Sequence, residues 1–131
     1  MSGWREHATR RLPAFLAAVA LAVLPAAAWA TSPNDGGYEV RDRGDVLALA
    51  SVASDATGTR AWLSVTWWDP WFGAGLGLVA EGELTGTRFR SRRIFGGHPF
   101  RDLAIEVDFV AGHVTFDDGF FRDTFDFVRA L

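Results

Sequence analysis

The chain has 131 residues, with 13 basic side chains, 16 acidic side chains and no cysteine. A chain of this length is expected to form a single domain with one core. Without cysteine there is no disulfide framework and no thiolate metal site, and the acidic balance argues against a dedicated nucleic-acid binder.

The first 30 residues have the layout of a secretory leader. Three arginines form a basic start, an apolar run extends over 14–24, and Ala28 and Ala30 place small residues before the predicted cleavage site. A membrane-spanning helix is the alternative, but it needs about 20 apolar residues. We therefore expect residues 1–30 to form a signal-peptide helix that is cleaved off. The mature protein would then be periplasmic or extracellular. The leader holds three of the basic and one of the acidic side chains, so the mature chain keeps a formal charge of −5.

Alternation of apolar and polar residues with a period of two, broken by glycine-containing turns, dominates the rest of the chain. After a flexible segment over 31–37, this pattern predicts one all-β domain over 38–131. An antiparallel up-and-down meander closes most simply into a barrel, because closure removes exposed strand edges, and a two-layer sandwich is the alternative. The eight strands are expected near 38–42, 45–53, 60–68, 76–84, 87–95, 103–110, 113–117 and 120–128.

The segment 45–53 is ambiguous between strand and helix. Its apolar residues also recur at a spacing that fits one face of a helix, and Asp45 would be the N-cap of that helix. We keep the strand as the prediction and the helix as the alternative.

Four glycine-containing dipeptides are expected to form two-residue hairpin loops. Residues at equal distances from such a loop face one another, so each loop predicts a register. The loops are Arg43-Gly44, Thr85-Gly86, Ala111-Gly112 and Asp118-Gly119. The predicted partners include Val40 with Leu47, Glu83 with Arg88, Val107 with Phe116, and Phe116 with Phe121.

Four aromatic residues surround an Asp-Pro pair in the stretch 67–72. The proline and the glycines that follow predict a loop, so not every ring is able to enter the core. Exposed Trp68, Trp71 and Phe72 would suit stacking on a sugar, contact with a protein, or a position in a membrane interface. The alternative is that Trp67 and Phe72 plug one end of the barrel.

A polar cluster consists of Glu106, Asp108, His113 and Asp117, on one side of a predicted hairpin. The predicted register places Glu106 opposite Asp117, a like-charge pair that is destabilising unless it is neutralised. A divalent cation would neutralise it, and His113 with a carboxylate would also suit acid–base chemistry. We favour the simpler interpretation that Arg122, on the next strand, supplies the missing charge.

Arginines form a ladder along another predicted strand. Arg88, Arg90 and Arg92 alternate, and Arg93 follows directly. Such a ladder is able to bind sulfate, phosphate or anionic groups of a cell envelope. Two glutamates are expected to face the first two arginines, which leaves Arg92 and Arg93 as candidate anion-binding residues.

These observations predict an exported, non-enzymatic binding protein of the cell envelope that contacts its partner through the loop 67–72. The partner would be an envelope protein, a glycan or a small apolar ligand, with peripheral membrane contact possible and no nucleic acid or cofactor. One alternative is a hydrolase-type or metal-dependent enzyme that uses His113 with Asp108 or Asp117. The other is a structural envelope protein held at the membrane surface by its tryptophan loop. No catalytic residue is assigned.

Overall fold

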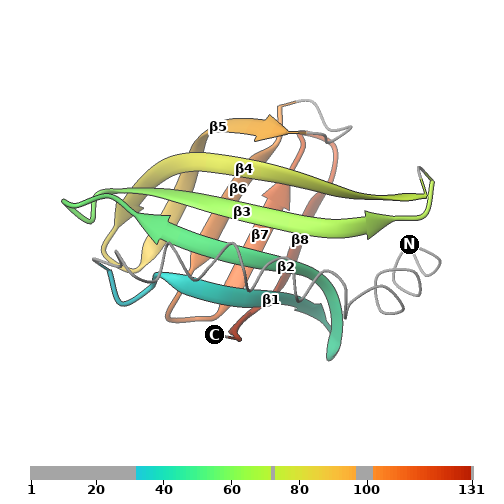
Figure 1. Ribbon diagram of the computed structural model, residues 1–131, viewed down its shortest axis with the longest axis horizontal. Helices are drawn as coiled ribbons and strands as arrows, with labels where there is room; N and C mark the ends of the chain where they lie inside the picture. Colours follow the sequence, from blue (N-terminus) through green and yellow to red (C-terminus); the bar gives the residue numbers. More distant parts are fainter. Residues whose placement is uncertain (1–31, 72, 97–101, 131) are drawn as a thin grey trace.

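The computed structural model describes residues 32–71, 73–96 and 102–130, so the predicted leader lies outside the described residues. Eight antiparallel strands follow one another around a closed barrel, as the sequence predicted (Figure 1). Within the described part, no helix is long and apolar enough to cross a bilayer. The strands are β1 (Gly36–Asp42), β2 (Asp45–Ser54), β3 (Arg60–Asp69), β4 (Ala74–Thr85), β5 (Arg88–Gly96), β6 (Ala104–Asp108), β7 (His113–Asp117) and β8 (Arg122–Arg129).

The strand β3 shows why the sequence forms a barrel wall. Side chains of a strand alternate between its two faces, and every second residue of β3, beginning with Ala61 and ending with Asp69, is buried. The residues between them, including Trp62 and Trp68, lie on the outer face and are less buried. The strand β2 alternates in its second half in the same way, so the helix considered for 45–53 is wrong.

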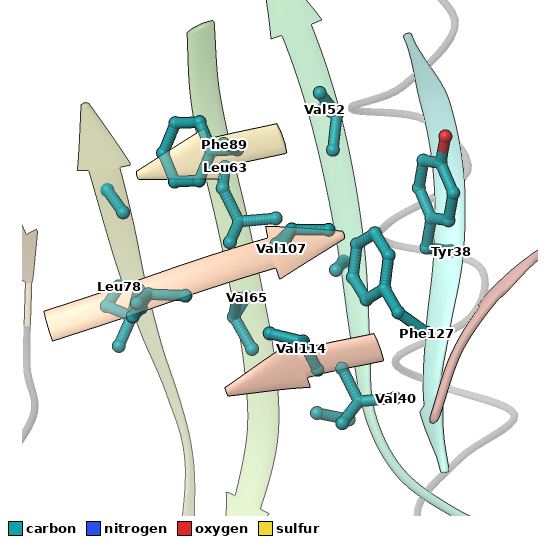
Figure 2. Packing of buried hydrophobic residues seen from close by; sticks show 14 of the residues in the cluster. Tyr38, Val40, Val52, Leu63, Val65, Leu78, Phe89, Val107, Val114 and Phe127 are labelled. Atoms are coloured by element: carbon teal, nitrogen blue, oxygen red, sulfur yellow. The ribbon is translucent and has the colours of Figure 1, made fainter. Parts of the chain in front are cut away.

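The interior of the barrel is an apolar core to which all eight strands contribute. Figure 2 shows side chains from facing walls, among them Val65, Val107 and Phe127, directed toward one another. The rings of Tyr38 and Phe127 stack with their centroids 4.3 Å apart. Burial of these side chains provides the main stabilisation, because the chain has no disulfide bond.

The first strand begins at Gly36, two residues earlier than predicted. The residues that precede it contact the barrel through hydrogen bonds. Ser54 Oγ donates to the carboxylate of Asp35 at 2.9 Å, and the guanidinium of Arg129 donates to the Asp35 carbonyl at 2.8 Å. The segment expected to be flexible over 31–37 is thus bound to both β2 and β8 in its described part.

The turn between β1 and β2 is the predicted Arg43-Gly44 loop. Both residues have positive φ, 53° and 87°, as a type I′ hairpin turn requires. A β-bulge follows next to Val40, so Val40 lies opposite Ala48 and not opposite Leu47 as predicted. The bulge adds one residue to β2, which two-residue loop geometry alone does not reveal.

The turn between β4 and β5 lies one residue later than predicted, at 86–87. Thr85 therefore pairs with Arg88, and Glu83 lies opposite Arg90 instead of Arg88. The acidic and basic side chains remain on the outer face, because a shift of register by two residues preserves the face of every side chain.

The register between β6 and β7 also differs from the prediction by two residues. Val107 lies opposite Val114 and not opposite Phe116, because the turn spans the four residues 109–112. The carboxylate of Asp108 closes this turn by accepting hydrogen bonds from two backbone N–H groups within it. The valine pair still points into the core, so the predicted apolar face is correct and only the partners are wrong.

Candidate functional site

The aromatic stretch 67–72 is divided by the structure into a buried and an exposed part. Trp67 lies in the core and is 8% exposed, whereas Trp71 is 91% exposed in the turn beyond β3. Trp68 lies between these extremes, half-buried on the outer face of the barrel. Phe72, the remaining predicted contact residue, lies outside the described residues.

The turn that carries Trp71 is held by a carboxylate. Asp69 is buried at the end of β3, and its Oδ1 atom accepts a hydrogen bond from the backbone N–H of Trp71 at 2.8 Å. This local bond directs the chain out of the strand immediately after the buried position. The backbone of Trp71 is therefore held by a hydrogen bond, although its indole ring is almost fully exposed.

A second exposed aromatic site, which the sequence analysis did not identify, lies in the turn 118–121. Phe120 is 94% exposed and Phe121 is 72% exposed. The prediction placed Phe121 opposite Phe116 inside the barrel, but Phe116 pairs with Asp123. The two-residue loop is wrong, because the chain makes a four-residue turn before β8 begins.

The side chain of Asp118 explains this longer turn. Its Oδ1 atom accepts hydrogen bonds from the backbone N–H of Phe121 at 2.8 Å and of Phe120 at 2.9 Å. Both bonds lower the pKa of the Asp118 carboxyl, and the bond from Phe121 has the larger effect. Asp117 adds a further bond from Gly119 N–H at 2.9 Å. An aspartate that binds the backbone two and three residues onward is a known turn signal, and this signal could have identified the site.

The two aromatic turns lie at the same end of the barrel. In an up-and-down meander alternate turns share an end, so the β1–β2, β3–β4 and β7–β8 turns are together, along with the last residues of β5 and the first residues of β6. We call this the loop end. Around the ring of eight strands the β3–β4 hairpin is opposite the β7–β8 hairpin, so Trp71 and Phe120 stand on opposite sides of one rim. Figure 1 shows the β3–β4 turn projecting beyond the barrel wall.

The predicted polar cluster lies on the outer wall of β6 and β7, and of its members Asp117, the last residue of β7, lies at this rim. Glu106 lies opposite Thr115, and Asp117 lies opposite Ala104, so the predicted like-charge pair does not form. Asp108 and His113 are direct cross-strand partners. No group of three or more histidines and carboxylates suited to a metal ion occurs among the described residues.

Basic side chains accompany each acidic member of this cluster. The pKa of Asp108 is lowered, first by the hydrogen bond from the Ala111 N–H and then by the nearby Arg88 guanidinium. The wall is therefore a network of exposed ion pairs, each of which contributes little stability. The nitrogen–oxygen distances are 3.3 Å for Arg88–Asp108, 3.7 Å for Arg90–Glu106, 3.7 Å for Arg122–Asp117 and 3.9 Å for His113–Asp126.

The candidate anion-binding arginines lie at a β-bulge in β5. Arg93 pairs with Glu81 and Ser91 with Gly82, so Arg92 is the extra residue between them. Both arginines are exposed. Arg92 donates to Glu83 at 2.8 Å, which lowers the pKa of that carboxyl. The structure thus places acidic side chains beside the two arginines that were expected to be free for an anion.

Comparison of the chain with protein-family models, with curated proteins and with solved structures gave no match. The fold and the site define a small eight-stranded up-and-down β-barrel with aromatic turns displayed at one end.

Proposed function

We propose that this chain is an exported binding protein that contacts a partner protein through the aromatic turns of its loop end. The observation that carries the proposal is the display of Trp71, Phe120 and Phe121, three large rings that are mostly exposed at one rim. Burying a large apolar side chain contributes roughly 1.5–3 kcal/mol. A partner that covers these exposed rings therefore gains a favourable contribution to the free energy of binding.

The turns that carry these rings support a binding role over a simple lack of packing. Asp69 and Asp118 fix the backbone of the two turns through hydrogen bonds to the aromatic residues themselves. Ordering a loop on binding costs free energy, and a turn that is already ordered avoids that cost. The backbone that carries these rings is thus held by hydrogen bonds before a partner arrives.

Export is the second part of the proposal, and the leader-like residues 1–30 support it. A bacterial-type host that secretes the protein should yield a mature N-terminus at Thr31. N-terminal sequencing of the secreted form tests this directly. An N-terminus at Met1 or Ser2 in secreted protein would contradict the leader.

Site-specific photo-crosslinking tests the binding surface. The photoreactive residue p-benzoylphenylalanine is placed at position 71 or 120, with position 110 as the matched control. Val110 is also strongly exposed, but it lies in a turn at the opposite end of the barrel. We expect positions 71 and 120 to crosslink to the same protein and position 110 to give no such adduct. Equal crosslinking from all three positions would contradict a defined contact surface at the loop end.

A further inference from the structure

We propose that the partner segment that docks on the loop end is basic, with lysine or arginine side chains set among apolar ones. This inference rests on the proposed function, because it names the chemistry of the partner at the same aromatic turns.

The charge of the loop end carries the inference. Among its described residues there are seven aspartates and two arginines, a formal excess of five negative charges. The opposite end has three aspartates and three arginines. Of the two ends, therefore, only the loop end carries a net negative charge among the described residues, and it is the end that displays the aromatic rings. The loop end comprises residues 42–45, 69–71, 73–74, 102–103 and 117–123, and the opposite end comprises 32–37, 54–60, 85–88, 108–113 and 129–130.

Aromatic rings and carboxylates together suit a cationic partner. A lysine or arginine head group is attracted to the face of an aromatic ring, and its apolar stem packs on the same ring. Asp118 and Asp123 flank the phenylalanine pair in the chain, so a cation over these rings also meets carboxylates. The hydrogen bonds that Asp118 accepts from both phenylalanines hold its carboxylate beside them.

The surroundings of Asp117 show which carboxylates are best placed. Asp117 has the Arg122 guanidinium 3.7 Å away, so part of its charge is already neutralised. Asp118 instead uses one oxygen, Oδ1, for both of its backbone hydrogen bonds. Neither bond uses Oδ2, and we assign this second oxygen to contact with the partner. Asp123 is exposed at the start of β8. We therefore assign recognition of the basic side chains chiefly to Asp118 and Asp123.

The same charge argues against a membrane surface as the partner. Exposed tryptophan and phenylalanine in turns suit a lipid interface, but membrane-surface anchors carry basic residues because biological leaflets are anionic. The acidic loop end would be repelled by such a leaflet. A basic polypeptide segment satisfies both the rings and the carboxylates.

The probes for the test are two short synthetic peptides and one type of vesicle. One peptide alternates lysine and leucine, the other alternates glutamate and leucine, and the vesicles are of phosphatidylcholine. Binding to the mature protein is measured by fluorescence anisotropy of labelled peptide or by co-sedimentation with vesicles. We expect the lysine peptide alone to bind, and its affinity to fall at least tenfold, about 1.4 kcal/mol, when salt is raised from roughly 0.05 to 0.5 M.

A pair of charge-matched variants distinguishes local recognition from general attraction to an acidic protein. D118N/D123N removes two negative charges at the rim, and the asparagine at 118 keeps an oxygen that accepts the turn hydrogen bonds. E106Q/D126N removes two negative charges from the outer wall. We expect the first variant to lose at least about fivefold more affinity for the lysine peptide than the second, a gap of about 1 kcal/mol.

Each other result overturns the inference. Equal losses in the two variants would mean that the peptide responds only to net charge. Binding of the glutamate peptide or of vesicles in preference to the lysine peptide would replace the basic segment by another partner. Absence of peptide binding would overturn it too, while crosslinks from position 71 would still support the proposed function. Loss of those crosslinks would remove the proposed function itself.

Discussion

The carboxylate of Asp118 accepts a hydrogen bond from the backbone N–H of Phe121 at 2.8 Å, and this bond closes the turn that displays the phenylalanine pair. The backbone adds a bond in the reverse direction, from the Asp118 N–H to the Phe121 carbonyl at 3.1 Å. The two residues therefore fix the length of the turn, and with it the register between β7 and β8.

Replacing Asp118 tests this role. D118A removes the acceptor, so the amide protons of Phe120 and Phe121 should exchange faster with solvent. D118N keeps an acceptor oxygen and should retain most of the protection. Amide hydrogen exchange followed by NMR measures both variants. If the amide protons of Phe120 and Phe121 exchange as slowly in D118A as in the native protein, the side chain of Asp118 does not hold the turn.

A pair of tryptophan variants separates the core from the site. Trp67→Ala should lower the free energy of unfolding by about 3–5 kcal/mol, because it removes a buried ring and leaves a cavity. Trp71→Ala should cost less than about 1 kcal/mol, because its ring is surrounded by solvent. Urea denaturation of the two proteins measures the difference. Equal losses would show that Trp71 supports the fold.

Gly82 provides a test of the bulge in β5. A Cβ atom at this position would lie 2.1 Å from the carbonyl oxygen of Arg90, so the two strands would have to move apart. Gly82→Ala should therefore destabilise the barrel more than Gly86→Ala, where the added atom meets open space and only the positive φ of 61° is unfavourable. That strain costs about 1–2 kcal/mol. Thermal denaturation of the two variants ranks them, and a smaller loss at Gly82 would contradict the close approach.

Arg122→Ala tests the outer wall. The guanidinium has an exposed partner in Asp117 at 3.7 Å, so the substitution should cost no more than about 0.5 kcal/mol. Adding calcium, manganese or zinc at millimolar concentration should leave the melting temperature unchanged in both proteins. A rise that disappears in Asp117→Asn would show that the wall holds a metal ion.

Acidification should weaken the fold through four described carboxylates whose pKa values are lowered. These are Asp55, Glu83, Asp108 and Asp118, which are held first by hydrogen bonds from Thr57, Arg92, Ala111 and Phe121 respectively. Each contributes stability above its ordinary pKa of 4.5 or 3.8 and loses that contribution as pH falls through the lowered value in the folded protein. The urea midpoint should therefore fall between about pH 5 and pH 2, and less steeply in D118N. A midpoint that rises with acidification would contradict the sign of these shifts.

The periodic pattern predicted the fold because an alternating strand has only two faces. Val107 and Val114 point inward whichever of two registers is adopted, since a shift by two residues preserves the face. Their actual partners depend on Asp108, whose side chain lengthens the neighbouring turn, and alternation contains no information about that bond. The alternating pattern therefore predicts the barrel, but it does not predict which residues are cross-strand partners.

The site was only partly predictable for the same reason. Trp71 follows a proline, and its position in a turn could be inferred from sequence. Phe120 and Phe121 directly follow Asp118-Gly119, and interpreting that dipeptide as a two-residue hairpin loop assigns them to a strand. Their exposure depends on the turn bonds of Asp118, a local interaction that outweighs the apolar character of the two side chains.

The shortest seam of the barrel lies between β5 and β6, where the two strands share three residue pairs in the described part, against ten between β3 and β4. Beyond Arg90, the side chain of Ser91 accepts a hydrogen bond from the Ile105 N–H at 2.8 Å, in a place where a longer ladder would use a carbonyl. The barrel is thus one sheet that is closed by a short strand pairing between β5 and β6. Local thermal opening of the barrel should begin at the β5–β6 pairing, where these two strands separate first while the long β3–β4 pairing remains intact.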